Sequence, residues 1–351
     1  MASLSVINDE MATRSFLEKK GRVPLRSDLL KGDLGSRQFW RLTYESGATE
    51  ILMVSLPEGH PKFTPGHQLC DYIDIAHILR MHNLRVPEIY HFDLESRLCL
   101  MEDFGNTTFL DALAKGHSNE DLTQKAGEAL KKMQDIPAGH LPDFMKSHIM
   151  AGHKRFVDWY CPVLFGRKVS DDFIAGFLDV WDGIFQSLPA PQNGFVFVDY
   201  HFGNIMLLDD GAPGLLDFQG AMHGPLAYDL TNLLQDARRD VSASTRDKIY
   251  RDMVAGMTEQ EQHHFGLWYD VLACQFHCRV IGQFIKLARL HDKPQHLVHL
   301  PRLAGYIHEN ANRRPVLAPF KQWLADQKID LREDVQVDLQ ALDNLIREDA
   351  F

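Results

Sequence analysis

The stretch FVFVDYHFGNIMLLDDGAPGLLDF, residues 195–218, holds a polar cluster after one apolar run and two further apolar runs around an Asp-Asp-Gly turn. Two apolar runs joined by such a turn are typical of a β-hairpin. If Leu208 pairs with Pro213, the same register places Asn204 opposite Asp217. We therefore expect an amide and a carboxylate side by side at the open end of the hairpin.

Asp199 lies five residues before Asn204, within a short loop of both hairpin residues. An amide oxygen and a carboxylate are hard oxygen ligands of the kind that magnesium binds together with waters and substrate phosphates. A second Asp beside such a metal can orient a hydroxyl and accept its proton. Each of these residues alone has a structural alternative, because Asn and Asp are common in turns. The ordered set Asp199-x-His201-x-x-Asn204, followed by Asp217, favours a functional site.

Length and composition limit the class of protein. The 351 residues suggest two domains or one large two-lobed domain, and 45% apolar residues suffice for a substantial core. A net charge of −11 argues against general nucleic-acid binding, which needs a basic face. Five scattered cysteines suit a reducing compartment, and we see neither a signal peptide nor a membrane span. We expect a cytoplasmic protein with a small-molecule substrate and no nucleic-acid or membrane partner, and its oligomeric state stays open.

The hydrophobic pattern changes along the chain from strand-rich to helix-rich, with the boundary near residues 103–106. Within this pattern we expect strands in 28–57 with a hairpin tip at 45–47, a helix over 67–82, strands near 86–92 and 97–102, helices that begin after Ser118 and Thr258, and a strand insertion at 194–218.

Two segments carry a resemblance to a known family. DYHFGN (199–204) and LLDFQGAMHGPLAYDLTNLLQDAR (215–238) resemble the catalytic and metal-binding motifs of the aminoglycoside phosphotransferase and choline kinase superfamily, which shares the protein-kinase fold. Further segments are most similar to the bacterial anomeric kinases of N-acetylmuramate and N-acetylglucosamine, namely 32–41, 51–59, 85–113 and 277–307. The resemblance covers most of residues 30–307.

The resemblance implies an α+β, two-lobed protein-kinase-like fold. Residues 1–103 become a small, strand-rich, nucleotide-binding N-lobe. Residues 104–351 become a larger, mainly helical C-lobe for catalysis and substrate binding. The cofactors implied are ATP and Mg²⁺.

Carried over by position, the resemblance makes Asp199 the catalytic base, with His201 in the same motif also a candidate catalytic residue. Asn204 and Asp217 become the magnesium ligands, and Asp229 a buried residue that steadies the catalytic loop. Residues 101–103 become the hinge whose backbone meets adenine. The candidate nucleotide-binding residues are Gly32, Gly35, Arg37, Arg41, Met101 and Asp103.

Two positions depart from the family pattern. Phe197 stands where the wider family usually has His, so we expect packing to hold the loop instead of a side-chain hydrogen bond. Met53 stands near the expected place of the strand Lys that holds the ATP phosphates. Arg37 and Arg41 are candidates for the missing positive charge, because a guanidinium suits phosphate oxygens. The alternative for Arg37 is a solvated loop residue.

Other motifs are weaker. Cys274 and Cys278 lie on one helical face, and in apolar surroundings buried thiols are the expected interpretation rather than a zinc site. The stripe Phe156, Trp159 and Tyr160 is typical of a core, although it falls in the family's region for substrate contacts.

We therefore expect an ATP-dependent phosphotransferase acting on a hydroxyl of a small polar molecule. The resemblance favours the anomeric hydroxyl of an amino sugar, in cell-wall recycling. An aminoglycoside or choline acceptor is one alternative, for which carboxylates or an aromatic cage would be needed. A nucleotide-binding scaffold without catalysis is the other, and the intact Asp199, Asn204 and Asp217 argue against it.

Overall fold

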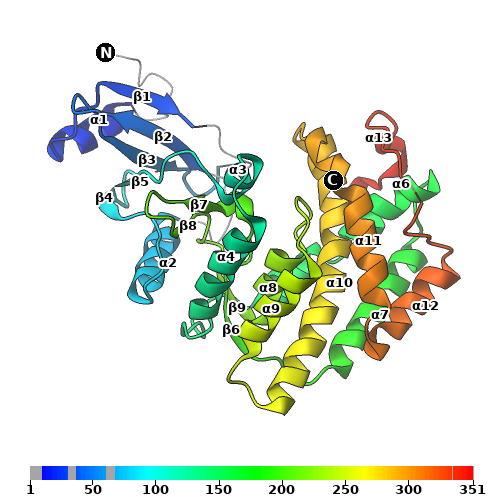
Figure 1. The fold of residues 1–351 in the computed structure, drawn as a ribbon. Helices are drawn as coiled ribbons and strands as arrows, with labels where there is room; N and C mark the ends of the chain where they lie inside the picture. The colour runs from blue at the N-terminus through cyan, green and yellow to red at the C-terminus, as the bar shows by residue number, and fades with distance from the viewer. Residues whose placement is uncertain (1–9, 31–36, 61–67, 334, 351) are drawn as a thin grey trace. The chain divides into compact units, whose positions relative to one another are not determined.

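The computed structural model describes residues 10–30, 37–60, 68–333 and 335–350. Contacts divide the chain into two compact units, each of which is described by itself (Figure 1). The first, here the sheet unit, comprises residues 1–118 and 199–221. The second, here the helical unit, comprises residues 119–198 and 222–351.

The sheet unit is built on an antiparallel sheet of five strands in the order β1-β2-β3-β5-β4. The strands are β1 (Arg26–Leu29), β2 (Arg37–Thr43), β3 (Thr49–Ser55), β4 (Ile89–Asp93) and β5 (Leu98–Glu102). The unit also holds the helices α1 (Glu10–Lys19), α2 (Leu69–Met81) and α3 (Phe109–Ala114), the 3-10 turn η3 (Phe202–Asn204) and the hairpin strands β7 (Ile205–Leu207) and β8 (Pro213–Leu215).

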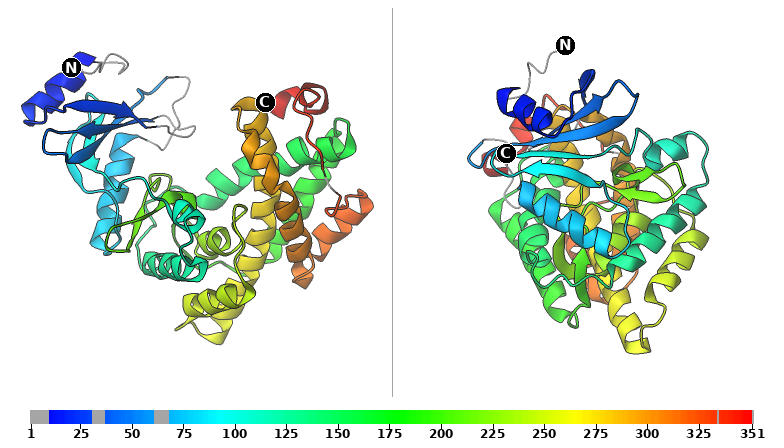
Figure 2. Two further views of the ribbon diagram at one scale, coloured as in Figure 1. Left: turned by 45° about the horizontal axis from the view of Figure 1, so that its top comes forward. Right: turned by 90° about the vertical axis from the view of Figure 1, so that its left-hand side faces the viewer.

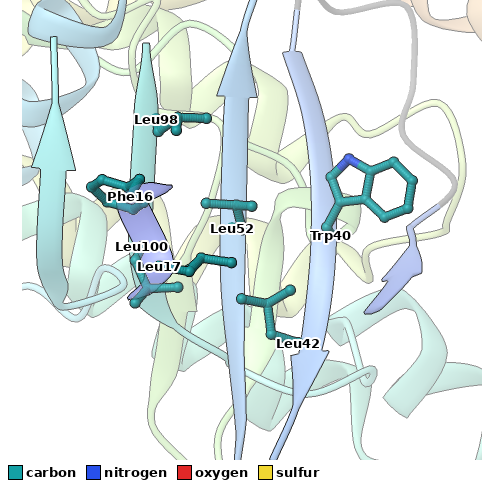
Figure 3. Close-up of a cluster of buried hydrophobic side chains, with 7 residues drawn as sticks. All are labelled: Phe16, Leu17, Trp40, Leu42, Leu52, Leu98 and Leu100. Atoms are coloured by element: carbon teal, nitrogen blue, oxygen red, sulfur yellow. The ribbon is translucent and has the colours of Figure 1, made fainter. Parts of the chain in front are cut away.

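The helices α1 and α2 lie on opposite faces of this sheet (Figure 2). Alternate residues of a strand point to opposite faces, so one face of the sheet carries an apolar cluster against α1. The cluster consists of Phe16, Leu17, Trp40, Leu42, Leu52, Leu98 and Leu100 (Figure 3). The other face carries Met101, whose sulfur accepts a hydrogen bond of 3.2 Å from Tyr72 of α2. Arg37 and Arg41 belong to this α2 face, because they alternate with Trp40 and Leu42 along β2.

The hairpin β7–β8 is fastened to the N-terminal part of the chain by backbone hydrogen bonds. Leu207 donates to the carbonyl of Thr107 at 2.9 Å, and Leu215 donates to that of Arg85 at 2.7 Å. A backbone bridge also joins Met206 to Thr108. These contacts place the predicted catalytic segment in the same unit as the predicted nucleotide-binding sheet.

The helical unit contains two short strands and the remaining helices of the described chain. The strands β6 (Asn193–Val196) and β9 (Met222–Pro225) pair with each other. The helices are α4 (Asn119–Met133), α5 (Met150–Gly152), α6 (Cys161–Phe165), α7 (Asp171–Ser187), α8 (Ala227–Leu234), α9 (Ala243–Val254), α10 (Glu259–Leu290), α11 (Leu300–Ala311), α12 (Ala318–Asp326) and α13 (Leu342–Leu345). Shorter turns are the π-helical η1 (Met145–Ile149) and η2 (Phe156–Tyr160) and the 3-10 turns η4 (Pro294–His299), η5 (Pro315–Leu317) and η6 (Glu348–Ala350).

The long helix α10 is the centre of the helical unit, where it packs against α8, α11 and η2 (Figure 1). Its start is fixed by the expected capping box, in which Thr258 and Glu261 exchange hydrogen bonds through side chains and backbone. Gly282 lets α10 approach the segment before η2, because a Cβ there would lie 1.9 Å from the Arg155 carbonyl oxygen. A side chain at this position has no room.

The expected α+β composition is confirmed: a strand-rich N-terminal part is followed by a mainly helical part with a strand insertion. The predicted helix over 67–82 is α2, and the predicted tip at 45–47 joins β2 to β3. The functional division at residues 103 and 104 stays a prediction. None of the helices in the described ranges has the length and apolar character needed to cross a membrane.

We predict that Gly282→Ala lowers the free energy of unfolding by about 1–3 kcal/mol, because overpacking must move backbone rather than a flexible side chain. Chemical denaturation measures this value. The matched control is Gly305→Ala on the exposed side of α11, where a Cβ meets no atom within 4 Å. That change should stabilise the protein by roughly 0.5–1 kcal/mol. Equal effects of the two substitutions would contradict the close approach of α10.

Candidate active site

The predicted catalytic loop is a compact turn between β6 and β7. Asp199 is exposed, and its backbone carbonyl accepts a hydrogen bond of 3.0 Å from the Asn204 amide nitrogen. His201 caps η3, since its Nδ1 accepts the Gly203 N–H at 3.1 Å. Because the Asn204 amide nitrogen donates to Asp199, the Asn204 side-chain oxygen is the atom that remains for another partner. The catalytic role of His201 stays a prediction, and its contact with Gly203 is a structural one.

The segment before Asp199 is held by α8. Asp229 is buried, and its carboxylate accepts the backbone N–H of Phe197 at 2.6 Å and that of Val198 at 3.0 Å. Asn232, one turn later on α8, donates to the Val198 carbonyl at 2.8 Å. Val198 has φ of 79°, a conformation that a β-branched residue adopts only when its surroundings impose it. These contacts agree with the steadying role that the resemblance gives to Asp229.

Phe197 fills the place of the usual family His without its polar contacts. Its side chain is buried, at 1% exposure. Its backbone is nevertheless anchored, because the Phe197 N–H donates to Asp229 and this bond does not depend on the Phe197 side chain. We expected packing to hold this loop. The ring of Phe197 is buried, and the buried carboxylate of Asp229 also holds the loop through backbone hydrogen bonds.

The predicted register of the β7–β8 hairpin is wrong by one residue. Leu207 pairs with Pro213, and the Leu208 N–H donates to the Ala212 carbonyl at 3.1 Å. The loop consequently has three residues, and Gly211 takes the left-handed conformation, φ 77°, that such loops place last. The predicted loop had four residues, which shifts every pair.

The corrected register still keeps the two predicted metal ligands close in the fold. Asn204 faces Leu216, whose N–H donates to the Asn204 carbonyl at 2.9 Å, and Asp217 is the next residue. Asp217 itself leaves the strand with φ of 62°, which Asp tolerates better than most residues. Its Oδ1 accepts a hydrogen bond of 2.7 Å from Gln219. The sequence analysis did not find Gln219, which carries no motif of its own.

The donor set around Asn204 and Asp217 suits a magnesium ion. The Asn204 amide nitrogen is occupied by Asp199, so its oxygen is the group available to a cation. Asp217 is exposed and presents a carboxylate of which one oxygen is oriented by Gln219. A site with few protein oxygens and room for water and phosphate is the type that Mg²⁺ uses.

Arg37 is a buried cation at the start of β2. Its side chain is 5% exposed, and its Nη2 lies 3.7 Å from Asp217 Oδ1, while the guanidinium stands 5.8 Å from the centre of the Tyr72 ring. Within the described residues, Nε and Nη1 have no hydrogen-bond partner. Burial lowers the pKa of Arg37, and the charge of Asp217 acts in the opposite direction. Arg37 is thus not a solvated loop residue, and it has donors available for an anion.

Arg41 is committed to the turn after β5. It makes a two-point contact with Asp103, at 2.6 and 2.8 Å, and donates to the Gly105 carbonyl at 2.8 Å and to Asn106 at 2.5 Å. These bonds fix the end of the predicted hinge, in which Met101 is buried in the sheet. Of the two candidate arginines, the contacts favour Arg37 for phosphate binding.

Several other sequence predictions have a definite position. Gly32 and Gly35 lie outside the described residues. Met53 is fully buried in β3, so this position offers no charge. Cys274 and Cys278 are buried free thiols, and among the described residues no His, Cys, Asp and Glu cluster suited to a metal occurs.

The aromatic stripe Phe156, Trp159 and Tyr160 is buried to 1% exposure or less, as expected for a core.

We predict that Asp229→Asn lowers the free energy of unfolding by about 1–3 kcal/mol, since an amide cannot accept both backbone N–H groups in the way a carboxylate does. Urea denaturation of the purified protein gives the value. Asp240→Asn is the control, because the Asp240 side chain is 88% exposed and such a change is worth less than about 0.5 kcal/mol. The anchoring role is lost if both variants are equally stable.

Comparisons with known proteins give the family and the fold of the chain. Residues 29–259 match the phosphotransferase enzyme family. The chain is 29% identical over 300 residues to the N-acetylmuramate/N-acetylglucosamine kinase of Pseudomonas aeruginosa, covering 84% of this chain and 86% of that protein. It is 26% identical over 308 residues to the protein of the same name from Neisseria meningitidis, covering 84% and 88%. In three dimensions it is similar to an ethanolamine kinase of Plasmodium vivax, with a TM-score of 0.56, 12% identity and coverage of 89% and 86%.

Proposed function

The chain belongs to the phosphotransferase enzyme family, and on this premise we propose that it transfers the γ-phosphoryl group of ATP to the anomeric hydroxyl of an amino sugar. Membership confirms the resemblance, the kinase-like fold and the expectation of an ATP-dependent kinase. The observations that support the proposal lie within one unit. Asn204 donates to the Asp199 backbone carbonyl, its own carbonyl accepts the N–H of Leu216 beside Asp217, and Asp217 lies 3.7 Å from Arg37. The acceptor follows from the names of the relatives, which are kinases of N-acetylmuramate and N-acetylglucosamine.

In the proposed reaction the anomeric oxygen attacks the γ-phosphorus, the bond to the β-phosphate oxygen breaks, and ADP leaves. Asp199 is exposed and orients the hydroxyl, whose proton it accepts as the new bond forms. Asn204 and Asp217 would hold Mg²⁺, which supplies charge compensation for the phosphates when bound. Gln219 keeps the Asp217 carboxylate in one orientation.

The remaining candidate residues bind the nucleotide in this proposal. Arg37 of β2 donates to phosphate oxygens in place of the strand Lys, whose position in β3 is taken by Met53, because the Nε and Nη1 atoms of Arg37 lack partners in the described chain. The backbone of Met101 and Asp103 meets adenine, and Arg41 holds that turn in place. Gly32 and Gly35 are proposed to lie against the phosphates. His201 shapes the loop through its cap on Gly203.

The proposal places the enzyme in the cytoplasm, where ATP is available, and its product in cell-wall recycling. Two alternatives predict different outcomes. An aminoglycoside or choline kinase would turn over only those acceptors. A nucleotide-binding scaffold would bind ATP without releasing ADP.

A coupled assay of ADP release tests the proposal directly. Purified protein with ATP and Mg²⁺ is offered N-acetylmuramate, N-acetylglucosamine, kanamycin and choline in parallel. We expect release with at least one of the two amino sugars and none above background with the other two compounds. Release only with kanamycin or choline would reassign the acceptor, and no release with any of them would favour the scaffold.

We predict that Asp199→Asn lowers kcat by roughly a hundred- to ten-thousand-fold, the usual cost of removing a general base. The substitution keeps the size and hydrogen-bonding reach of the side chain. ATP binding measured by calorimetry should survive, because the nucleotide contacts are elsewhere. Asp209→Asn in the exposed hairpin turn is the control and should keep wild-type kcat. Full activity of Asp199→Asn would remove the proposed base.

We predict that Arg37→Ala lowers kcat/KM for ATP by about 10- to 100-fold, the effect of a lost hydrogen bond to a charged group. Arg37→Lys should recover part of the loss, since it keeps the charge but not the planar fork. Arg26→Ala on the exposed edge strand is the control for a general charge effect. Wild-type kinetics of Arg37→Ala would instead leave the phosphates to the metal or to Arg41.

A further inference from the structure

The side chain of Tyr72 lies between α2 and the sheet and contacts three separate segments of the sheet unit. Its ring centre is 5.8 Å from the Arg37 guanidinium and 4.6 Å from the centre of the Phe218 ring. Its hydroxyl donates to the Met101 sulfur at 3.2 Å. Tyr72 is 3% exposed, and all four residues belong to the sheet unit. One side chain of α2 thus contacts the candidate phosphate ligand, the candidate hinge and the residue that follows Asp217.

The carboxylates at the start of α2 do not take this place. In protein kinases a Glu of the corresponding helix forms an ion pair with the phosphate-binding Lys. Asp71 of α2 instead caps its own helix, because its side chain accepts the backbone N–H of Gln68 at 2.8 Å. Asp74 is exposed. The helix therefore meets Arg37 with an aromatic ring rather than with a carboxylate.

Arg41, on the same face of β2, shows what a carboxylate partner does to an arginine. Its contact with Asp103 is a two-point one, at 2.6 and 2.8 Å, so those N–H groups are occupied. Arg37 is different, because its Nη2 stands 3.7 Å from Asp217 Oδ1, which is too far for a hydrogen bond. Its Nε and Nη1 have no partner in the part of the chain that the structure describes. An aromatic face attracts a guanidinium without accepting its N–H groups in the plane, so the donors of Arg37 remain for an anion.

The ring of Tyr72 is also uncharged and fixed. Burial raises the pKa of its hydroxyl above the ordinary value, so the phenol stays protonated at neutral pH. A carboxylate in the same position would add a negative charge that repels phosphate. The contacts with Phe218, which is fully buried, and with Met101 hold the ring in one orientation.

We propose that Tyr72 is a positioning residue, whose ring holds the Arg37 guanidinium apart from Asp217 so that Arg37 binds the ATP phosphates and Asp217 binds the metal. This inference rests on the proposed function and deepens it. Without the ring, Arg37 is free to close on Asp217 in a two-point ion pair like that of Arg41 with Asp103. Both groups would then be lost to the nucleotide and its metal.

The test is the Kd of ATP, measured by calorimetry with Mg²⁺ and without an acceptor. We expect Tyr72→Leu to weaken ATP binding by about 3- to 30-fold, the value of a buried cation–π contact. Tyr72→Phe keeps the ring and removes only the hydroxyl, so its Kd should stay within about twofold of wild type. Tyr72→Met, which fills the same space with a flexible side chain, serves if the Leu variant does not fold.

A double-mutant cycle separates positioning from structural support. If Tyr72 acts through Arg37, then Tyr72→Leu should change the Kd by less than about twofold once Arg37→Ala is already present. A general loosening of α2 would weaken binding by the same factor in both backgrounds. Leu79→Val is the matched control, because Leu79 is buried on the same helix and its substitution loosens the packing of α2. This variant should keep the wild-type Kd.

Wild-type ATP affinity of Tyr72→Leu would overturn the proposal. Equal weakening by Tyr72→Leu with and without Arg37 would overturn it as well and make Tyr72 a support of α2. Both measurements are independent of the acceptor, so a wild-type protein that binds ATP but turns over no amino sugar would overturn the proposed function alone. A wild-type protein that binds no ATP would overturn both.

Discussion

The carboxylate of Asp229 accepts hydrogen bonds from two consecutive backbone N–H groups, those of Phe197 and Val198, and the arrangement of the proposed catalytic loop depends on this contact. Val198 is thereby kept at φ of 79°, where its side chain alone would not place it. The chain then turns so that Asp199 is exposed while its neighbours are buried. Asn204 closes the loop on the Asp199 carbonyl. A buried anion is stable here because both of its oxygens accept hydrogen bonds.

This anchoring explains how the loop is held although Phe197 stands where the wider family usually has His. A side-chain hydrogen bond from the usual His is replaced by main-chain bonds to Asp229 and by the buried ring. The missing strand Lys has a similar explanation. Met53 belongs to the apolar core. Arg37 of β2 provides a positive charge on the same face of the sheet, next to Asp217. The two departures from the family pattern therefore leave the charges of the proposed site in place.

Local patterns predicted most of the fold. The tip at 45–47 follows from turn residues, the helix α2 from hydrophobic periodicity, and the start of α10 from its capping box. Each of these signals lies within a short stretch of the sequence. The hairpin after Asn204 shows the limit, because an Asp-Asp-Gly-Ala sequence suits a loop of three or four residues. Only the left-handed Gly211 decides between them, and it moves the register by one. The pairing of Arg37 with Asp217 joins residues far apart in the chain, and no local pattern encodes it. The same holds for the commitment of Arg41 to Asp103.

The central claim is that this site phosphorylates an anomeric hydroxyl. The position of the phosphate on the product tests it most directly. After turnover with N-acetylglucosamine or N-acetylmuramate, the isolated sugar phosphate is heated in mild acid, and released inorganic phosphate is measured against a 6-phosphate standard. The account predicts a 1-phosphate, which hydrolyses readily while the standard persists. A product as stable as the 6-phosphate would contradict the anomeric assignment.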